Sequence, residues 1–151
     1  MLYEFLNNAV NRHLDETMPL LEQLTEISIM SKPVSDGREI GEVVLHLLRS
    51  LHYYMRGVCE GKWEPLPYNL ETYDTAESII QLAEDVFKKV RSIMSFIRIR
   101  NLMAEIDSFN RPATIAEIIL EMLEHSIHHR GQITVYYRLM GISPKTINYI
   151  I

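Results

Sequence analysis

Residues 117–140 read EIILEMLEHSIHHRGQITVYYRLM, and this stretch decides the fold that we expect. Successive residues of a helix turn by about 100°, so residues three and four apart lie on one face. Such a face passes through Ile115, Ile118, Ile119, Met122, Ser126, Ile133, Tyr136, Tyr137 and Met140. Thr114 followed by Glu117 is typical of a capped helix start, and Gly141 with Pro144 is typical of a helix end. The stretch therefore predicts one long amphipathic helix.

Three further stretches have the composition and spacing of helices, approximately over residues 3–29, 36–60 and 74–102. Pro19 predicts a kink or break in the first of them. The pairs Asp36–Glu39 and Asp74–Glu77 resemble capping boxes that open the second and third. No segment shows a convincing strand alternation. The sequence therefore predicts an all-α protein: a four-helix bundle with short connections, forming a single domain over residues 1–151.

The composition excludes several classes of protein. The chain has 151 residues, a net charge of −5 and one cysteine, Cys59. An acidic chain is poorly suited to neutralising phosphates, so we expect no nucleic-acid partner. No apolar run approaches the roughly 20 residues of a membrane span, and polar residues follow the first methionine closely, so we expect neither a membrane segment nor a signal peptide. The single cysteine excludes an internal disulfide and favours a cytoplasmic location.

The motif HSIHHRGQ, residues 125–132, places polar side chains on this otherwise apolar helix. His129 lies within the apolar face and His125 lies at its edge. Their spacing of four residues allows both rings to reach one ion. His128 is rotated by roughly 60–100° from the pair and is a poorer ligand. Two buried imidazoles indicate either a metal site or a hydrogen-bonded core, and a metal would need a third ligand.

Three other histidines, His13, His46 and His52, are candidates for that third ligand. His52 lies roughly 80° from the centre of the apolar stripe of its helix, whereas His46 lies roughly 160° from it. Periodicity alone favours His52 weakly, because that helix is apolar on nearly every side. The residues leave His13 open as well.

Two motifs resemble the DinB/YfiT-like superfamily of putative metal-dependent enzymes (the DinB family). HSIHHRGQ followed by YYRLMGISP is similar to the last helix of that superfamily, which has an H-x-x-x-H-R-G-Q pattern. VVLHLLRSLHYYMRG, residues 43–57, is similar to its second helix, where a histidine is followed by leucine, serine and aromatic residues. The resemblance extends over the whole chain in the number, order and length of the helices, and it implies a four-helix bundle.

The resemblance further implies that His46, His125 and His129 are the metal ligands, which selects His46 against the periodicity. It implies a divalent transition metal, zinc or nickel, and a homodimer. Related proteins are metal-dependent hydrolases and thiol-dependent transferases, so we expect a small-molecule substrate and a water or thiol activated by the metal. Three neutral imidazoles suit such an ion, and an open fourth position suits catalysis.

The neighbours of the ligands have weaker signals. Gln132 is placed to orient an imidazole or the metal-bound water, and Tyr53 lies near His46 in helical rotation. Arg130 is expected to pair with an acidic residue at a helix end or a subunit contact, and Gly131 to permit close approach of another helix. A loop rich in proline and aromatic residues follows the second helix and contains Trp63, Pro65, Pro67 and Tyr68. It could be a lid, although a loop pinned to the bundle by its rings is the simpler interpretation.

An alternative function belongs to a different class. The chain has no HExxH glutamate, and Glu121 and Glu124 lie off the ligand face, so no general base is evident. The alternative is therefore a non-catalytic dimeric bundle whose metal is structural or absent.

Overall fold

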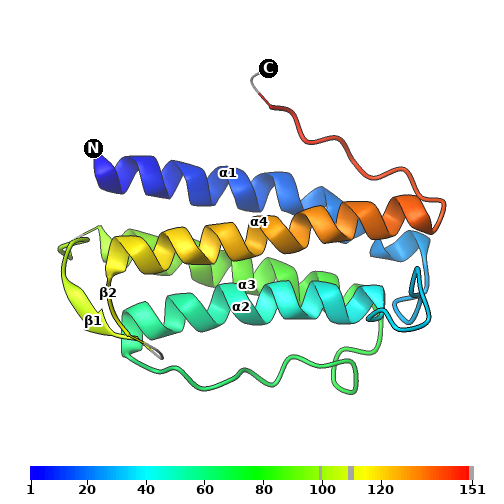
Figure 1. The fold of residues 1–151 in the computed structure, drawn as a ribbon, viewed down its shortest axis with the longest axis horizontal. Helices are drawn as coiled ribbons and strands as arrows, with labels where there is room; N and C mark the ends of the chain where they lie inside the picture. Colours follow the sequence, from blue (N-terminus) through cyan, green and yellow to red (C-terminus); the bar gives the residue numbers. More distant parts are fainter. Residues whose placement is uncertain (99, 109–110, 150–151) are drawn as a thin grey trace.

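The computed structural model describes residues 1–98, 100–108 and 111–149, and within them the chain forms four long helices and a small sheet (Figure 1). The elements, in chain order, are α1 (Leu2–Glu22), the 3-10 turn η1 (Gln23–Glu26), α2 (Ile40–Glu60), α3 (Ala76–Ile97), β1 (Glu105–Asp107), β2 (Pro112–Thr114) and α4 (Ile115–Leu139). The prediction of an all-α four-helix bundle is confirmed.

The helices are arranged in two parallel pairs. α1 and α4 run in one direction, whereas α2 and α3 run in the other (Figure 1). α2 has its most extensive contacts with α4 and α3, and α1 packs against the same two helices. Because α2 and α3 are parallel, residues 61–75 must return along the length of the bundle before α3 begins. The expectation of short connections is wrong for this segment.

The core lies between the four helices and explains the composition of α2. Most of the apolar side chains of α2 are buried, because α3 and α4 cover different sides of this helix. The core residues of α2 are Ile40, Val43, Val44, Leu45, Leu47, Leu48, Leu51, Met55 and Val58. Since buried apolar surface stabilises a fold by about 25 cal/mol per Å², this central helix contributes a large part of the stability.

The helix ends follow local hydrogen bonding and correct several boundaries. Thr114 caps α4 reciprocally with Glu117, as predicted. The box that opens α3 is formed by Thr75 and Ser78, one residue after the predicted pair. α2 has no side-chain cap at Glu39, so the predicted Asp36–Glu39 box is absent from this described helix start.

The lengths of two helices also differ from the prediction. α1 continues through Pro19 and ends at Glu22, where the 3-10 turn η1 follows. α3 ends at Ile97, before the predicted limit near residue 102. The segment that follows pairs Ile106 with Ala113 in an antiparallel ladder, so the expectation of no strand is wrong there. Strands of three residues are too short to show an alternating pattern in the sequence.

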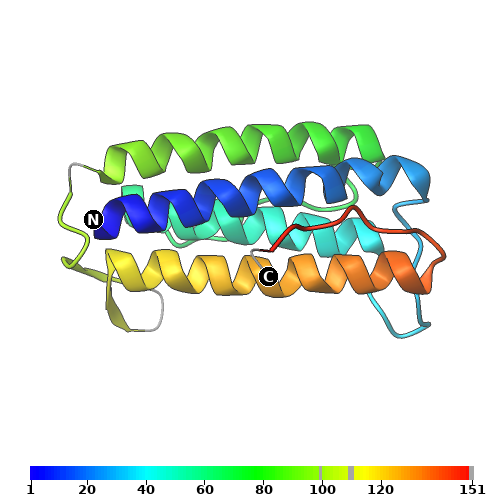
Figure 2. The ribbon, with the colours of Figure 1, turned by 90° about the horizontal axis from the view of Figure 1, so that it is seen from above.

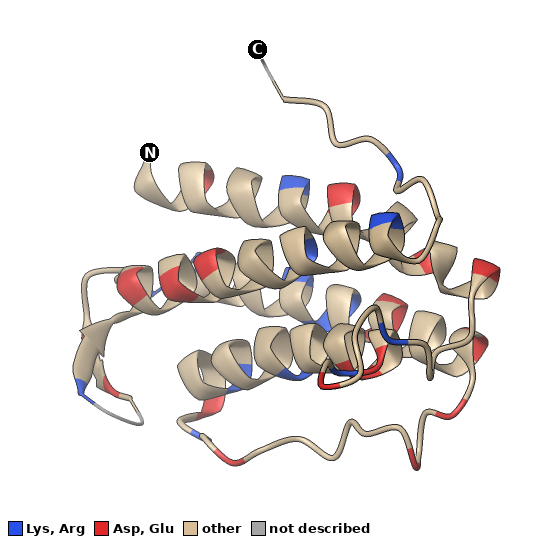
Figure 3. Cartoon of the chain, turned by 45° about the vertical axis from the view of Figure 1, so that its right-hand side comes forward, with Lys and Arg blue, Asp and Glu red and all other residues tan. Residues whose placement is uncertain are grey.

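Two features of the surface complete the fold. Acidic and basic residues are interspersed along the helices, and the charged residues in the first half of α4 are acidic (Figure 3). Of these, Glu117 lies in the first turn, where a negative charge interacts favourably with the positive end of the helix dipole. The segment after α4 turns back over the side formed by α1 and α4 (Figure 2). Within the described part of the chain, no helix has the length and apolar character to cross a membrane.

Candidate metal centre

Three histidines from two helices meet inside the bundle. His46 on α2 and His125 and His129 on α4 offer ring nitrogens that all lie within 4.8 Å of one another. The ring centroid of His46 lies 5.2 Å from that of His125 and 4.5 Å from that of His129. These three form the single group of potential metal ligands among the residues that the structure describes. We call them the histidine cluster.

The spacing within α4 fits a metal ion. The Nε2 atoms of His125 and His129 lie 3.3 Å apart. Two imidazole nitrogens bound to one ion at about 2.0–2.1 Å in a tetrahedral shell are separated by about 3.3 Å. Their positions thus match those of two ligands that share one ion.

Gln132 fixes the orientation of one ring. The Nδ1 atom of His129 lies 2.9 Å from Gln132 Oε1, which is one turn further along α4. An amide oxygen can only accept, so Nδ1 donates its proton and Nε2 keeps a lone pair directed at the cluster. The Nδ1 atom of His125 is buried and has no hydrogen-bond partner among the described residues. For His129, Nε2 is therefore the nitrogen available for an ion, and the Nε2 atom of His125 faces it across 3.3 Å.

Burial keeps the three rings neutral. Desolvation lowers the pKa of His46 from 6.5 to about 4, with smaller contributions from His129, His125 and two nearby arginines. Burial also lowers the pKa of His125 and of His129, each aided by neighbouring cationic or imidazole groups. Neutral imidazole is the form that binds a metal ion. At neutral pH the cluster is thus ready to bind one without first losing protons.

The other histidines lie outside the cluster. His52 has its Nδ1 atom 2.7 Å from the hydroxyl of Tyr68, and the two rings stack. His13 belongs to α1, and its Nε2 atom lies 2.6 Å from Ser126 Oγ on α4. His128 is exposed, as its rotation on the helix predicted. The structure therefore brings His46 to the pair on α4, against the weak preference of periodicity for His52.

Comparisons with known proteins place the chain in a family. The family model described as "DinB family" matches residues 2–151. The chain belongs to the DinB family. The uncharacterized protein YjoA of Bacillus subtilis is 30% identical over 132 residues, which cover 85% of this chain and 84% of YjoA. This match confirms the resemblance seen in the two histidine motifs.

Solved structures of DinB-like proteins have the same fold. The crystal structure of YjoA from Bacillus subtilis has a TM-score of 0.77 and 25% identity, covering 97% of this chain and 99% of that one. A DinB-like protein from Bacillus cereus has a TM-score of 0.75 and 22% identity, covering 96% and 97%. The second likeness shows the fold alone. The DinB bundle is thus the framework that holds the histidine cluster.

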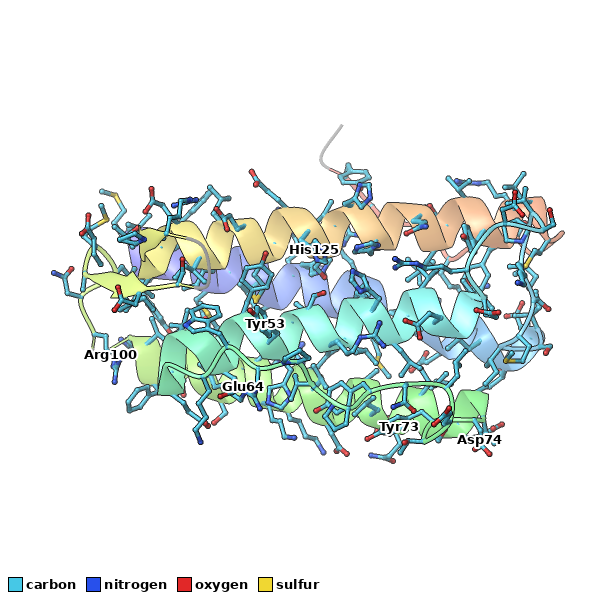
Figure 4. The ribbon with its side chains drawn as sticks, turned by 60° about the horizontal axis from the view of Figure 1, so that its bottom comes forward. Tyr53, Glu64, Tyr73, Asp74, Arg100 and His125 are labelled. Carbon is cyan, nitrogen blue, oxygen red and sulfur yellow. The ribbon has the colours of Figure 1, made fainter. Side chains whose placement is uncertain are left out.

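In this DinB chain, aromatic residues border the cluster on one side. Figure 4 shows His125 on the side of α4 that faces α2, and Tyr53 on α2. The ring of Tyr53 lies 5.5 Å from that of Trp63. A cavity of about 280 Å³ is bounded by His46, Tyr53, Trp63 and Leu66. One ligand of the cluster is therefore next to a largely apolar cavity.

Trp63 pins the loop after α2 to the rest of the molecule. Its Nε1 atom donates to the carbonyl of Asp107 in β1 over 3.0 Å. Its ring lies over Gly57, where a Cβ atom would come within 2.3 Å of the ring. These contacts support the pinned-loop interpretation over that of a lid. No sequence pattern indicates the hydrogen bond to Asp107, because that residue lies 44 positions after Trp63 in another element.

Tyr54 lies near the cluster, and the expectation for Gly131 is wrong. The ring of Tyr54 lies 6.3 Å from that of His125, and Tyr54 lines a second cavity of about 220 Å³ with Tyr53 and Glu121. Gly131 is exposed, and nothing lies within 4 Å of a Cβ added there, so the predicted close helix approach is wrong.

Arg130 has the acidic partner that the sequence predicted. Its Nη1 atom lies 3.1 Å from Glu16 Oε2, a pair that joins the middle of α4 to α1. The same atom lies 3.0 Å from His13 Nδ1. The contact is therefore between helices within the bundle, and neither residue lies at a helix end.

Proposed function

We propose that this DinB protein binds a divalent transition metal, zinc or nickel, through His46, His125 and His129 and uses it in a reaction on a small molecule. The observation that carries the proposal is the convergence of three neutral imidazoles within 4.8 Å, two of them at a spacing that matches shared coordination. The reaction is either hydrolysis or transfer to a thiol.

The proposed location is the cytoplasm. The lone cysteine of the chain, Cys59, is a free thiol, which supports a reducing compartment.

The donor set supports this class of metal. Imidazole suits zinc, nickel and ferrous iron, whereas magnesium and calcium prefer oxygen ligands. Three protein ligands leave a coordination position for water or substrate, as in catalytic zinc sites, whereas structural sites have four. When bound, such an ion lowers the pKa of a coordinated water or thiol and makes it a nucleophile near neutral pH.

The residues of the chain supply orientation and binding. Gln132 accepts from His129 Nδ1 and thereby holds the Nε2 lone pair toward the cluster. Tyr53, Trp63 and Leu66 line the cavity beside His46 and form an apolar surface for part of a substrate. The hydroxyls of Tyr53 and Tyr54 are donors that could orient a polar group of the substrate near the cluster.

The alternative is a non-catalytic dimeric bundle whose metal is structural or absent. One observation favours it: Glu121, the carboxylate one turn before His125, is ion-paired with Arg111 and is therefore a poor general base. A homodimer is proposed under either function. The exposed apolar side chains Leu2, Phe5 and Leu120, where α1 and α4 begin, support it because such side chains favour association.

Metal analysis of protein purified without an affinity tag tests the proposal. We expect about one zinc or nickel per chain in the wild type, since three imidazoles bind one ion. His46→Ala, His125→Ala and His129→Ala should each lose it. His52→Ala and His128→Ala are matched controls that should retain it. A wild type that contains no metal and binds neither ion on titration would contradict the proposal.

The reaction is tested with the metal-loaded wild type. One assay measures conjugation of a thiol to 1-chloro-2,4-dinitrobenzene, and the other measures hydrolysis of a p-nitrophenyl ester. We expect turnover in one of them that chelation abolishes and His129→Ala removes. A metal-loaded protein without chelator-sensitive turnover on a broader panel of thiols and esters would favour the non-catalytic alternative.

A further inference from the structure

A further cavity, separate from the two beside the histidine cluster, lies between α1 and α4. Its volume is about 680 Å³, within the range of roughly 300–1,000 Å³ of small-molecule sites. Residues from three segments line it: α1, α4 and the chain after α4, which turns back over these helices (Figure 2). It shares no lining residue with the histidine cluster. The site proposed above therefore does not account for it.

A buried arginine faces this cavity with unused donors. The side chain of Arg130 is 5% exposed, and its Nη1 atom is shared by Glu16 and His13. The Nη2 and Nε atoms make no hydrogen bond to a residue that the structure describes. Arg130 forms part of the wall of the cavity. A guanidinium in this position is suited to a carboxylate.

The described residues that line the cavity carry one more positive charge than negative charge. Arg12 also lines it, is exposed, and has no salt bridge to a residue that the structure describes. Glu16 is the one acidic residue of the lining and is paired with Arg130. His13 accepts from Arg130, which can only donate, so its ring is neutral there. Two arginines and one carboxylate give a net charge of +1 in a chain whose net charge is −5.

The remaining surface of the cavity is apolar. Ala9 of α1 and Leu123 and Ile127 of α4 line it, and the side chain of Ile127 is 46% exposed. Tyr149 adds an aromatic ring from the chain after α4. A site with a single excess positive charge beside an apolar wall is complementary to a molecule with one anionic end and one hydrocarbon end.

We propose that this cavity binds a small amphipathic carboxylate, with the carboxylate on Arg130 and Arg12 and the hydrocarbon against Leu123 and Ile127. A dianion such as phosphate fits less well, because the cavity has one unmatched positive charge and offers an apolar wall. Arg130 directly follows His129, so α4 carries both sites on different faces. We expect the carboxylate to bind in this cavity whether or not the histidine cluster contains a metal.

Calorimetric titration of the full-length, tag-free protein with octanoate tests this proposal. Octan-1-ol and acetate are matched probes that lack the charge and the hydrocarbon, and inorganic phosphate tests a dianion. We expect octanoate to bind and each of the other three to bind at least about tenfold more weakly, because both halves of the site contribute. Octanoate should bind equally to His129→Ala, which separates this site from the histidine cluster.

Charge variants provide the sharper test. Arg12→Gln should weaken octanoate binding by about tenfold, the low end of what a charge-assisted hydrogen bond contributes. Glu16→Gln should tighten it, because Arg130 loses its competing carboxylate. Arg138→Gln replaces an exposed arginine near the end of α4 that does not line the cavity, so it is the control and should bind as the wild type does. Absence of octanoate binding, equal binding of octan-1-ol, or unchanged affinity in both charge variants at the cavity would overturn the proposal.

Discussion

The Nε2 atoms of His125 and His129 lie 3.3 Å apart on the face of α4 that meets α2. Burial lowers the pKa of each ring and favours its neutral form, and His46 approaches both rings from the neighbouring helix. This separation of the two Nε2 atoms depends on the orientation of each ring as much as on the spacing of the two residues along the helix. Four substitutions test the contacts that set these orientations and hold the bundle together.

Gln132 is expected to act on the metal through His129. Replacing it by alanine removes the acceptor at Nδ1, and loss of such a partner lowers metal affinity by about 10- to 100-fold. The stoichiometry at saturation should remain that of the wild type, because the three histidines are intact. Competition with a chromophoric chelator measures the affinity. Gln81→Ala, an exposed glutamine on α3, is the control. Equal affinities of Gln132→Ala and the wild type would rule out the orienting role.

His13 is expected to make the stability of the bundle depend on pH. Burial, aided by Arg130, lowers its pKa from 6.5 to about 3. Between these values the unfolded chain binds a proton that the folded chain does not. The contribution of His13 to the free energy of unfolding is therefore fully present above pH 6.5 and is lost as the pH falls toward 3. Well inside this range the loss is about 1.4 kcal/mol per pH unit.

His13→Gln tests this dependence, because glutamine retains a donor and an acceptor but does not titrate. Urea unfolding of metal-free protein at pH 6.5 and pH 4.5 should show that the wild type loses about 2 kcal/mol more than the variant. His128→Gln replaces an exposed histidine and should follow the wild type. Parallel losses in the wild type and His13→Gln would show that His13 does not cause the dependence.

Gly57 and Gly131 should respond oppositely to alanine. A Cβ atom at Gly57 would lie 2.3 Å from the ring of Trp63, so the ring and its loop must move. Trp63 is the single tryptophan of the chain, and its fluorescence should shift to longer wavelength in Gly57→Ala. Gly131→Ala meets no neighbour and should stabilise the helix by up to about 1 kcal/mol without changing the emission. An unchanged emission maximum in Gly57→Ala would contradict the contact.

Tyr137 connects the end of α4 to the end of α1. Its ring is fully buried, and its hydroxyl donates to the carbonyl of Leu20 over 2.6 Å. Tyr137→Phe leaves that carbonyl without this donor and should lower the free energy of unfolding by roughly 1–3 kcal/mol. Tyr136→Phe is the control, because the partly exposed Tyr136 makes no side-chain hydrogen bond to the described residues. Equal unfolding free energies of the two variants would contradict this role.

Helix content and family followed from features that are local in the sequence. The spacing along residues 115–140 and the Thr114–Glu117 box depend on contacts within one or two turns, so they predicted α4 almost to the residue. The capping boxes of the other helices were less secure. Near α3 several Asp, Thr and Ser residues compete for the cap, and local hydrogen bonds selected Thr75 and Ser78.

Part of the candidate site could be predicted from the sequence. The four-residue spacing placed His125 and His129 together, because both belong to one rigid helix. The choice between His46 and His52 could not be made from periodicity, since both lie off the buried apolar face of α2 and periodicity does not show which neighbour each one meets. The family motif selected His46, and the structure places it in the cluster while His52 contacts Tyr68. Its role as a metal ligand stays a prediction until metal content is measured.

The sequence by itself determined that this chain forms four amphipathic helices and carries a paired histidine motif, because both follow from interactions a few residues apart. The tertiary structure alone decided the parallel arrangement of α2 and α3, the insertion of Trp63 against Gly57, and the contact of Arg130 with Glu16 and His13. These depend on which helix faces meet, and that choice minimises buried unpaired groups and unfilled volume over the whole bundle. A pattern within a few residues of sequence cannot predict this total over the whole bundle.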